Sequence, residues 1–117
     1  MTEYTKQIFS EDVSKDIRVF AFKVLRNVTI STPVDTGRAR GNWQVGIDVP
    51  KTSVLSNLDR SGGSSLTSGL SQLSRVTRFN TVWITNNLDY IGKLNDGSSL
   101  QAPAKFVESG IVRALND

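Results

Sequence analysis

The sequence predicts an α+β fold, in which a small antiparallel sheet packs against a long N-terminal helix and short helices follow toward the C-terminus. Apolar residues recur every three or four positions between residues 11 and 31, which is typical of an amphipathic helix. They alternate with polar residues near 43–49 and 79–85, as in half-buried strands, and return to helical spacing after residue 88. A chain of 117 residues is expected to form a single domain, residues 1–117.

The first helix is expected over roughly residues 11–31. Ser10 is a suitable N-cap, and the acidic residues after it suit the positive end of a helix dipole. Proline disfavours helical geometry in the residue before it, so Thr32-Pro33 should end the helix. The expected inward stripe is Val13, Ile17, Phe20, Ala21, Val24, Leu25 and Val28.

A strand should follow, with Trp43, Val45, Ile47 and Val49 on its buried face and Pro50 at its end. The next stretch, about residues 51–65, is polar and rich in Gly and Ser, so it is predicted to be a flexible loop. A short helix is then predicted from the spacing of Leu66, Leu70, Leu73 and Val76, despite Gly69.

A second strand is expected over residues 79–85, closing in a turn at Asn86-Asn87. One or two helical turns around Tyr90 should stop at Asn95-Asp96-Gly97. Pro103 fits the first turn of a last helix. The inward face of that helix is predicted to consist of Phe106, Val107, Ile111, Ala114 and Leu115.

The composition argues against most enzyme classes. With no Cys and no His, the chain has no thiolate nucleophile, no imidazole ligand and no proton shuttle near neutral pH. No cofactor or metal is expected. The N-terminus lacks the layout of a signal peptide and no apolar run approaches the roughly 20 residues that span a bilayer, so synthesis in a cytoplasm and no membrane contact are expected.

The net charge of +3 is concentrated in the middle of the chain. Residues 36–78 carry six basic and two acidic side chains, which gives +4. Such a region could face phosphates, although a solvated surface is the simpler interpretation. Three aromatic residues that could stack on bases, Trp43, Phe79 and Trp83, fall at positions that fit a sheet core or an interface.

The segment from Thr32 to Trp43 has the most distinctive chemistry. Asp35 and Thr36 can hydrogen-bond a turning backbone, and Gly37 permits a positive φ. Arg38 and Arg40 should then alternate outward, with Trp43 as a buried anchor. Residue by residue, this is also what a plain helix-to-strand connection would need.

Taken as a string, Pro33-Val34-Asp35-Thr36-Gly37-Arg38 with Trp43 resembles the signature of the tailed-phage neck and tail-completion proteins, the family of the lambda minor tail protein Z. A second block is similar in the same order: Asn86-Asn87 followed by Tyr90, then Gly97-Ser98-Ser99 and Gln101-Ala102-Pro103 before Phe106-Val107. The sequence departs from the family pattern where proline is common at Asp89, glutamate at Asn95 and glycine at Lys105. Residues 50–78 show no specific likeness.

The resemblance implies a structural virion protein, made in the host bacterial cytoplasm, that forms part of the ring joining the DNA-filled head to the tail. It implies that the partners are other copies of itself, adjacent neck or connector proteins and tail-tube proteins, and DNA passing through the lumen without sequence recognition. A tail terminator ring that caps the tail tube is the alternative within this biology, and a stand-alone nucleic-acid-binding protein is the alternative outside it. Residues expected at the assembly interface are Arg38, Arg40, Gly97, Ser98, Ser99 and Gln101. Residues expected to hold the motifs are Pro33, Asp35, Thr36, Gly37, Trp43, Asn86, Asn87, Tyr90 and Pro103.

Two weaker patterns point to ligands. Gly97-Ser98-Ser99 could cradle a phosphate, but the Lys-Ser/Thr pair that opens a helix in a P-loop does not follow it. Asp12 and Asp16 lie one helical turn apart and could hold a cation, although exposed helix charges are the simpler interpretation.

Overall fold

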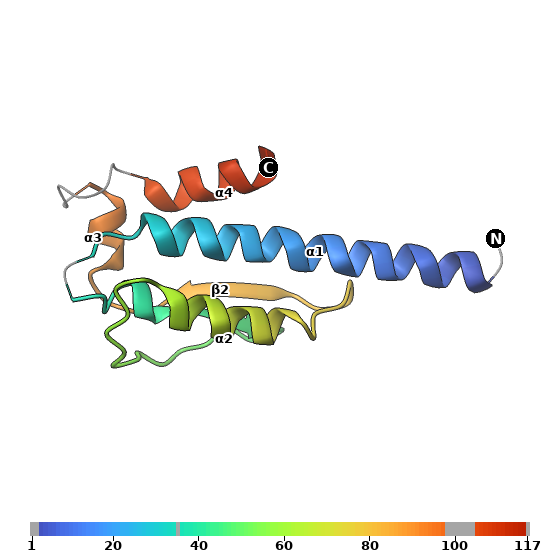
Figure 1. Ribbon diagram of the computed structural model, residues 1–117, viewed down its shortest axis with the longest axis horizontal. Coiled ribbons are helices and arrows are strands. Elements are labelled where there is room, and N and C mark those ends of the chain that lie inside the picture. Colours follow the sequence, from blue (N-terminus) through green and yellow to red (C-terminus); the bar gives the residue numbers. More distant parts are fainter. Residues whose placement is uncertain (1–2, 35, 98–104, 117) are drawn as a thin grey trace.

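The computed structural model describes residues 3–34, 36–97 and 105–116 (Figure 1). Its arrangement of helices with a two-stranded antiparallel sheet confirms the predicted α+β class. The elements in order are α1 (Glu3–Ser31), the 3-10 turn η1 (Arg40–Asn42), β1 (Trp43–Ile47), α2 (Gly63–Leu73), β2 (Val82–Asn86), α3 (Ile91–Asn95) and α4 (Phe106–Asn116).

Helix α1 begins earlier than predicted. It starts at Glu3, so Ser10 lies inside it rather than at its N-cap. The residues between them include no proline or glycine, so nothing in the sequence interrupts the helix there. Its end at Ser31, before Pro33, is as predicted. The N-terminal part of α1 extends beyond the rest of the fold (Figure 1).

The sheet pairs β1 with β2 in antiparallel register, from Trp43 opposite Asn86 to Ile47 opposite Val82. β1 stops at Ile47 because Asp48 adopts a φ of 65°, which turns the chain out of the extended conformation. The prediction that Val49 continues the buried face is therefore wrong, and Val49 is 68% exposed. In β2 the predicted alternation is confirmed, since Val82 and Ile84 pack on the core while Trp83 is exposed.

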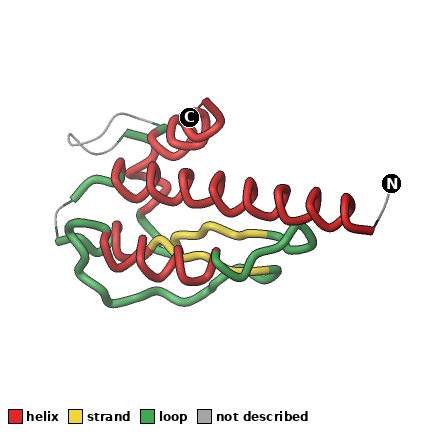
Figure 2. The backbone as a smooth tube through the Cα atoms, turned by 45° about the vertical axis from the view of Figure 1, so that its right-hand side comes forward, coloured by secondary structure: helices red, strands yellow, loops and turns green. Residues whose placement is uncertain are grey.

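The core lies between α1, the sheet and α2, and α4 packs on the other side of α1 (Figures 1 and 2). Helix α2 contacts both α1 and β1 through Gly69, where a Cβ would lie 2.2 Å from Leu25 Cδ2. Because Gly69 takes the inward position, Leu70, which was predicted to face inward, is 55% exposed.

Helix α4 also approaches α1 through small residues. Gly110 and Ala114 are buried with Phe106, and a Cβ on Gly110 would lie 3.2 Å from Val28 Cγ1. This close approach turns Ile111 and Leu115 outward, with 39% and 68% of their surface exposed, so their predicted inward placement is wrong. Pro103, predicted in the first turn of this helix, lies outside the described residues.

Among the helices of residues 3–34, 36–97 and 105–116, none has the length and hydropathy that a membrane crossing requires.

Candidate functional site

The 32–43 loop folds into a compact unit at the C-terminal end of α1, built around Gly37. Gly37 has a φ of 89°, which confirms the predicted positive φ. Its carbonyl oxygen accepts hydrogen bonds from the N–H groups of Gly41 (2.9 Å) and Asp59 (3.0 Å). A Cβ at this position would lie 2.5 Å from the backbone nitrogen of Arg60, so close packing as well as conformation requires glycine.

Two neighbours of Gly37 were predicted to bond the turning backbone. Thr36 Oγ1 accepts a hydrogen bond from the Arg38 N–H at 3.3 Å, as expected. Asp35 lies outside the described residues. Pro33, which follows the end of α1, is half-buried.

Trp43 anchors the end of the loop, as predicted. Its side chain is 7% exposed, and Nε1 donates to Thr32 Oγ1 at 2.8 Å. Thr32 in turn donates from Oγ1 to the Val28 carbonyl at 2.6 Å and is fully buried. The first residue of β1 is thereby tied to the last turn of α1.

The prediction that the Arg40 side chain points outward is wrong. Arg40 is half-buried, and its guanidinium donates to three carbonyl oxygens: Nη2 to Ile30 (2.7 Å), Nε to Thr32 (2.9 Å) and Nη1 to Arg60 (2.9 Å). Carbonyls at the end of a helix lack partners within the helix, and a cation suits the negative end of its dipole. Arg40 therefore caps α1, whereas Arg38 is exposed as predicted.

Asp59 is a central residue of this unit that sequence reasoning missed. It is 9% exposed and accepts hydrogen bonds from the N–H groups of Gly62 and Ser64 at 3.1 and 2.8 Å. These groups lie at the start of α2, so its carboxylate caps that helix from upstream. An acidic residue shortly before a Gly-Ser-Ser helix start was the available signal.

Asn42, also missed, ties the segment after β1 to the loop. Its amide donates to the carbonyl of Leu55 at 2.9 Å, and its Oδ1 accepts the Leu55 N–H at 2.7 Å. Farther along, residues 63–65 form the first turn of α2. The predicted loop at about 51–65 is thus shorter than expected and is held at several points.

The structure brings the second sequence block against the first. Asn86 donates from Nδ2 to the carbonyl of Ala39 at 2.9 Å, and its Oδ1 accepts the Leu88 N–H at 3.3 Å, which makes the predicted turn. Asn87 donates to the carbonyls of Lys51 and Ser53. Tyr90 is half-buried at the start of α3.

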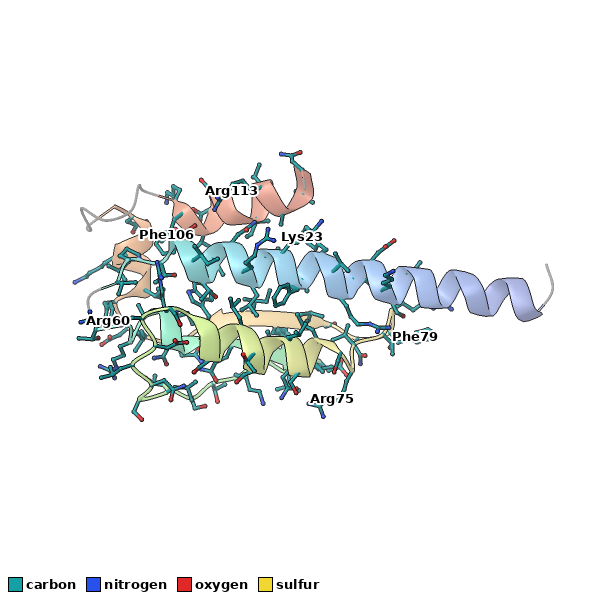
Figure 3. The ribbon with its side chains drawn as sticks, in the orientation of Figure 1. Lys23, Arg60, Arg75, Phe79, Phe106 and Arg113 are labelled. Carbon is teal, nitrogen blue, oxygen red and sulfur yellow. The ribbon has the colours of Figure 1, made fainter. Side chains whose placement is uncertain are left out.

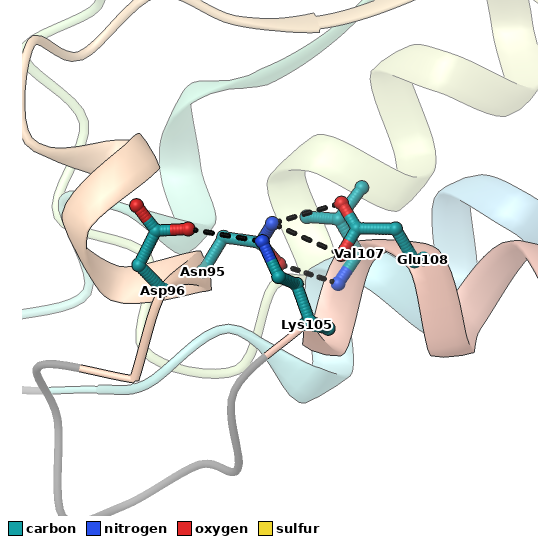
Figure 4. A network of polar contacts seen from close by, with 5 residues as sticks. All are labelled: Asn95, Asp96, Lys105, Val107 and Glu108. Carbon is teal, nitrogen blue, oxygen red and sulfur yellow. Dashed lines mark hydrogen bonds and ion pairs between the residues drawn. The ribbon is translucent and has the colours of Figure 1, made fainter.

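Asn95, the last residue of α3, ties α3 to the start of α4 through its side chain (Figure 4). Its Oδ1 accepts the Val107 N–H at 2.9 Å, and its Nδ2 donates to Glu108 Oε1 at 2.9 Å. Lys105 forms an exposed ion pair with Asp96 at 3.2 Å and has a φ of 65°. Of the predicted interface residues here, Gly97 has a φ of 96°, whereas Ser98, Ser99 and Gln101 lie outside the described residues.

The possible cation site and a cavity among the described residues bear on whether the chain binds a ligand. The residues described include no group of three or more carboxylates that could hold a metal ion. The side chain of Asp12, half of the possible cation pair with Asp16, is outside them. A cavity of about 120 Å³ lies between β1, α2 and the segment 51–57 that follows β1. It is lined mainly by Gly, Ser, amide and apolar residues, and Lys51 is its charged residue.

Surface charges and apolar side chains are spread widely. Arg60 and Arg75 from the basic middle lie near opposite ends of α2 (Figure 3). Trp43 is in the core, but Phe79 is 79% exposed beneath the Arg78 guanidinium, and Trp83 is 42% exposed. An apolar groove of about 280 Å³ runs between α1 and α2, lined by Arg18, Val19, Phe22, Lys23, Arg26, Leu70, Leu73 and Ser74.

No known family model, curated protein or solved structure significantly matches this chain.

Proposed function

We propose that this chain is a structural protein of a tailed-phage virion, a subunit of the neck or tail-completion ring that joins the filled head to the tail. The observation that carries the proposal is the 32–43 string. Its residues that resemble the family pattern have demanding structural roles here: Gly37 at a positive φ against another backbone segment, and Trp43 bonded to Thr32. A signature kept for structural reasons would place its residues at positions of this kind.

The second block adds independent support at a position where the sequences differ. The family pattern commonly has glycine where this chain has Lys105. The backbone at Lys105 has a φ of 65°, in the left-handed region that favours glycine. A glycine, common at this position in the family pattern, would suit the conformation that Lys105 adopts here.

The exposed apolar side chains suit a protein that works in an assembly. Val112 and Leu115 on α4 are 54% and 68% exposed, and Val19 and Leu70 border the groove between α1 and α2. An exposed apolar groove such as the one between α1 and α2 commonly marks contacts with other proteins. Joining head and tail requires such contacts, to further copies in the ring and to connector and tail-tube proteins above and below.

A role as a stand-alone nucleic-acid-binding protein has less support. Specific or tight binding of a duplex needs basic side chains gathered on one surface. Arg60 and Arg75 instead lie far apart along α2, and Arg40 is engaged with backbone carbonyls. Contact with DNA passing through a ring lumen needs no such patch.

The experiment is deletion of the coding sequence from the phage or prophage that carries it, followed by electron microscopy of the lysate. The proposal predicts filled heads and separate tails of normal length, with joining restored by the chain supplied from a plasmid. Separate tails of abnormal length would instead identify the tail terminator. Joined, infectious particles at normal yield would overturn the proposal.

A further inference from the structure

The outer edge of β2 carries a row of unpaired backbone groups. In an antiparallel pair, residues alternate between those that bond the partner strand and those that point away from it. The Asp48 N–H donates to the Thr81 carbonyl at 2.7 Å, and the Trp43 N–H turns away from β2 to the Arg40 carbonyl, which together set the phase of the ladder. Within the described residues, the N–H and C=O groups of Val82 and Ile84 therefore face outward without backbone partners.

This edge lacks the features that normally prevent strands from pairing. Native edges are protected by charged side chains, proline, bulges or a covering element. No charged residue or proline occurs between Arg78 and Asp89, and the register of β1 with β2 has no bulge. Helix α2 packs along β1, whereas the main contact of β2 with another element is β1 itself. The β2 edge is thus open to an incoming strand.

Segment 51–55 presents the complementary row on another part of the same subunit. The Lys51 carbonyl accepts hydrogen bonds from the side chains of Thr85 and Asn87, and the Ser53 carbonyl accepts them from Gln44 and Asn87. Both backbone groups of Leu55 bond the Asn42 side chain. Inward hydrogen bonds recur at every second residue, 51, 53 and 55, as they do along an extended chain. The N–H and C=O groups of Thr52 and Val54 are therefore expected to face away from the body of the subunit. Both side chains are exposed, and Thr and Val favour strands.

We infer that β2 of one copy of this chain pairs with segment 51–55 of the next copy, so that a short intermolecular sheet links neighbouring subunits. The two surfaces are different parts of the molecule, so the contact is head-to-tail, the type that closes into a ring. This inference rests on the proposed ring. It specifies that backbone hydrogen bonding, rather than charge pairing, joins the subunits.

The test uses the absence of native cysteine. Thr81→Cys and Val54→Cys are prepared as separate single variants and mixed, and a short thiol cross-linker is added to the purified mixture and to particles carrying both variants. The inference predicts a mixed cross-linked dimer that neither variant forms alone. Dimers of Thr81→Cys alone would indicate β2-to-β2 pairing, and no mixed product in either preparation would also overturn the inference.

A matched pair of variants tests the role of the backbone. Val82→Pro removes one outward N–H, and proline is tolerated at the first residue of an edge strand. Val82→Ala shortens the same side chain but keeps the N–H. Each substitution is introduced into the Thr81→Cys variant, and the melting temperatures of the two proteins are compared. The proline variant should lose most of the cross-link to Val54→Cys, whereas the alanine variant should retain it. Equal yields of cross-linked dimer would overturn the inference.

These experiments separate the two proposals. If the chain is found in particles but no mixed product forms, the ring function stands and the β2 contact is wrong. If the mixed product forms with purified protein but the chain is absent from particles, the contact stands and the neck function is wrong.

Discussion

Replacement of Gly37 by alanine should destabilise the chain strongly, because it has three unfavourable effects: on the backbone conformation, on the packing and on a hydrogen bond. A residue with a side chain at a φ of 89° costs about 1–2 kcal/mol relative to a favourable conformation. The added Cβ would also lie 2.5 Å from Arg60 N and 2.6 Å from Asp59 C, so this backbone must shift. The hydrogen bond from the Asp59 N–H to the Gly37 carbonyl, worth about 0.5–1.5 kcal/mol, would be strained or lost.

Together these effects predict a loss of roughly 2–4 kcal/mol, a large share of the roughly 5–15 kcal/mol typical of a domain. Urea and thermal unfolding followed by circular dichroism measure it. Gly92→Ala is the matched control, since a Cβ there meets nothing within 4 Å and helix α3 should tolerate or favour it. A free energy of unfolding for Gly37→Ala within about 0.5 kcal/mol of the parent's would show that neither the positive φ nor the close packing requires glycine.

Three further predictions concern other residues of the described site. Arg40→Gln should lower the free energy of unfolding by about 1–3 kcal/mol, because it removes charged hydrogen bonds to the end of α1. Arg38→Gln should leave the free energy of unfolding unchanged. Equal effects of the two substitutions in a urea titration would show that Arg40 does not cap α1. Lys105→Gly should raise stability by up to about 1 kcal/mol by relieving its positive φ, and Lys105→Ala should not; a stability loss with glycine in thermal unfolding would count against the strain. In amide exchange, the Leu55 N–H should be protected and the Val54 N–H should exchange quickly, and Asn42→Ala should abolish the difference; uniformly fast exchange in the parent would contradict the tether.

The sequence predicted those features that depend on local rules. The end of α1 before Pro33, the alternation in β2 and the positive φ at Gly37 all follow from the conformational preferences of single residues or short patterns. The burial of Trp43 also followed from the period of its strand. These elements would fold similarly in many tertiary contexts, which is why the pattern was sufficient.

The errors arose where long-range packing decided the outcome. Ile111 and Leu115 fit an apolar stripe, but the small residues Gly110 and Ala114 let α4 approach α1 closely and turned that stripe outward. Val49 fit the period of β1, but Asp48 ended the strand. A prediction from helical or strand periodicity considers only the positions of apolar residues, so it does not identify glycines that face the core.

The polar residues of the site were the hardest to place. Arg40 alternates with Arg38 in sequence, so both were expected at the surface, yet the unpaired carbonyls at the end of α1 bind one of them. Asp59 lies in the polar stretch that has no recognisable motif, and its role depends on Gly37 and the start of α2 being brought together. These contacts depend on how the turns between the partners fold, so they become evident only in the structure.

The central claim, that the chain is a ring subunit at the junction of head and tail, is tested most directly by quantitative mass spectrometry of purified, salt-washed particles from the phage that encodes it. A ring subunit at this junction should be present at a fixed ratio to the portal protein. When heads and tails are separated, it should remain with one of the two. Joined, infectious particles that lack the chain would show that it is not a ring subunit at the junction.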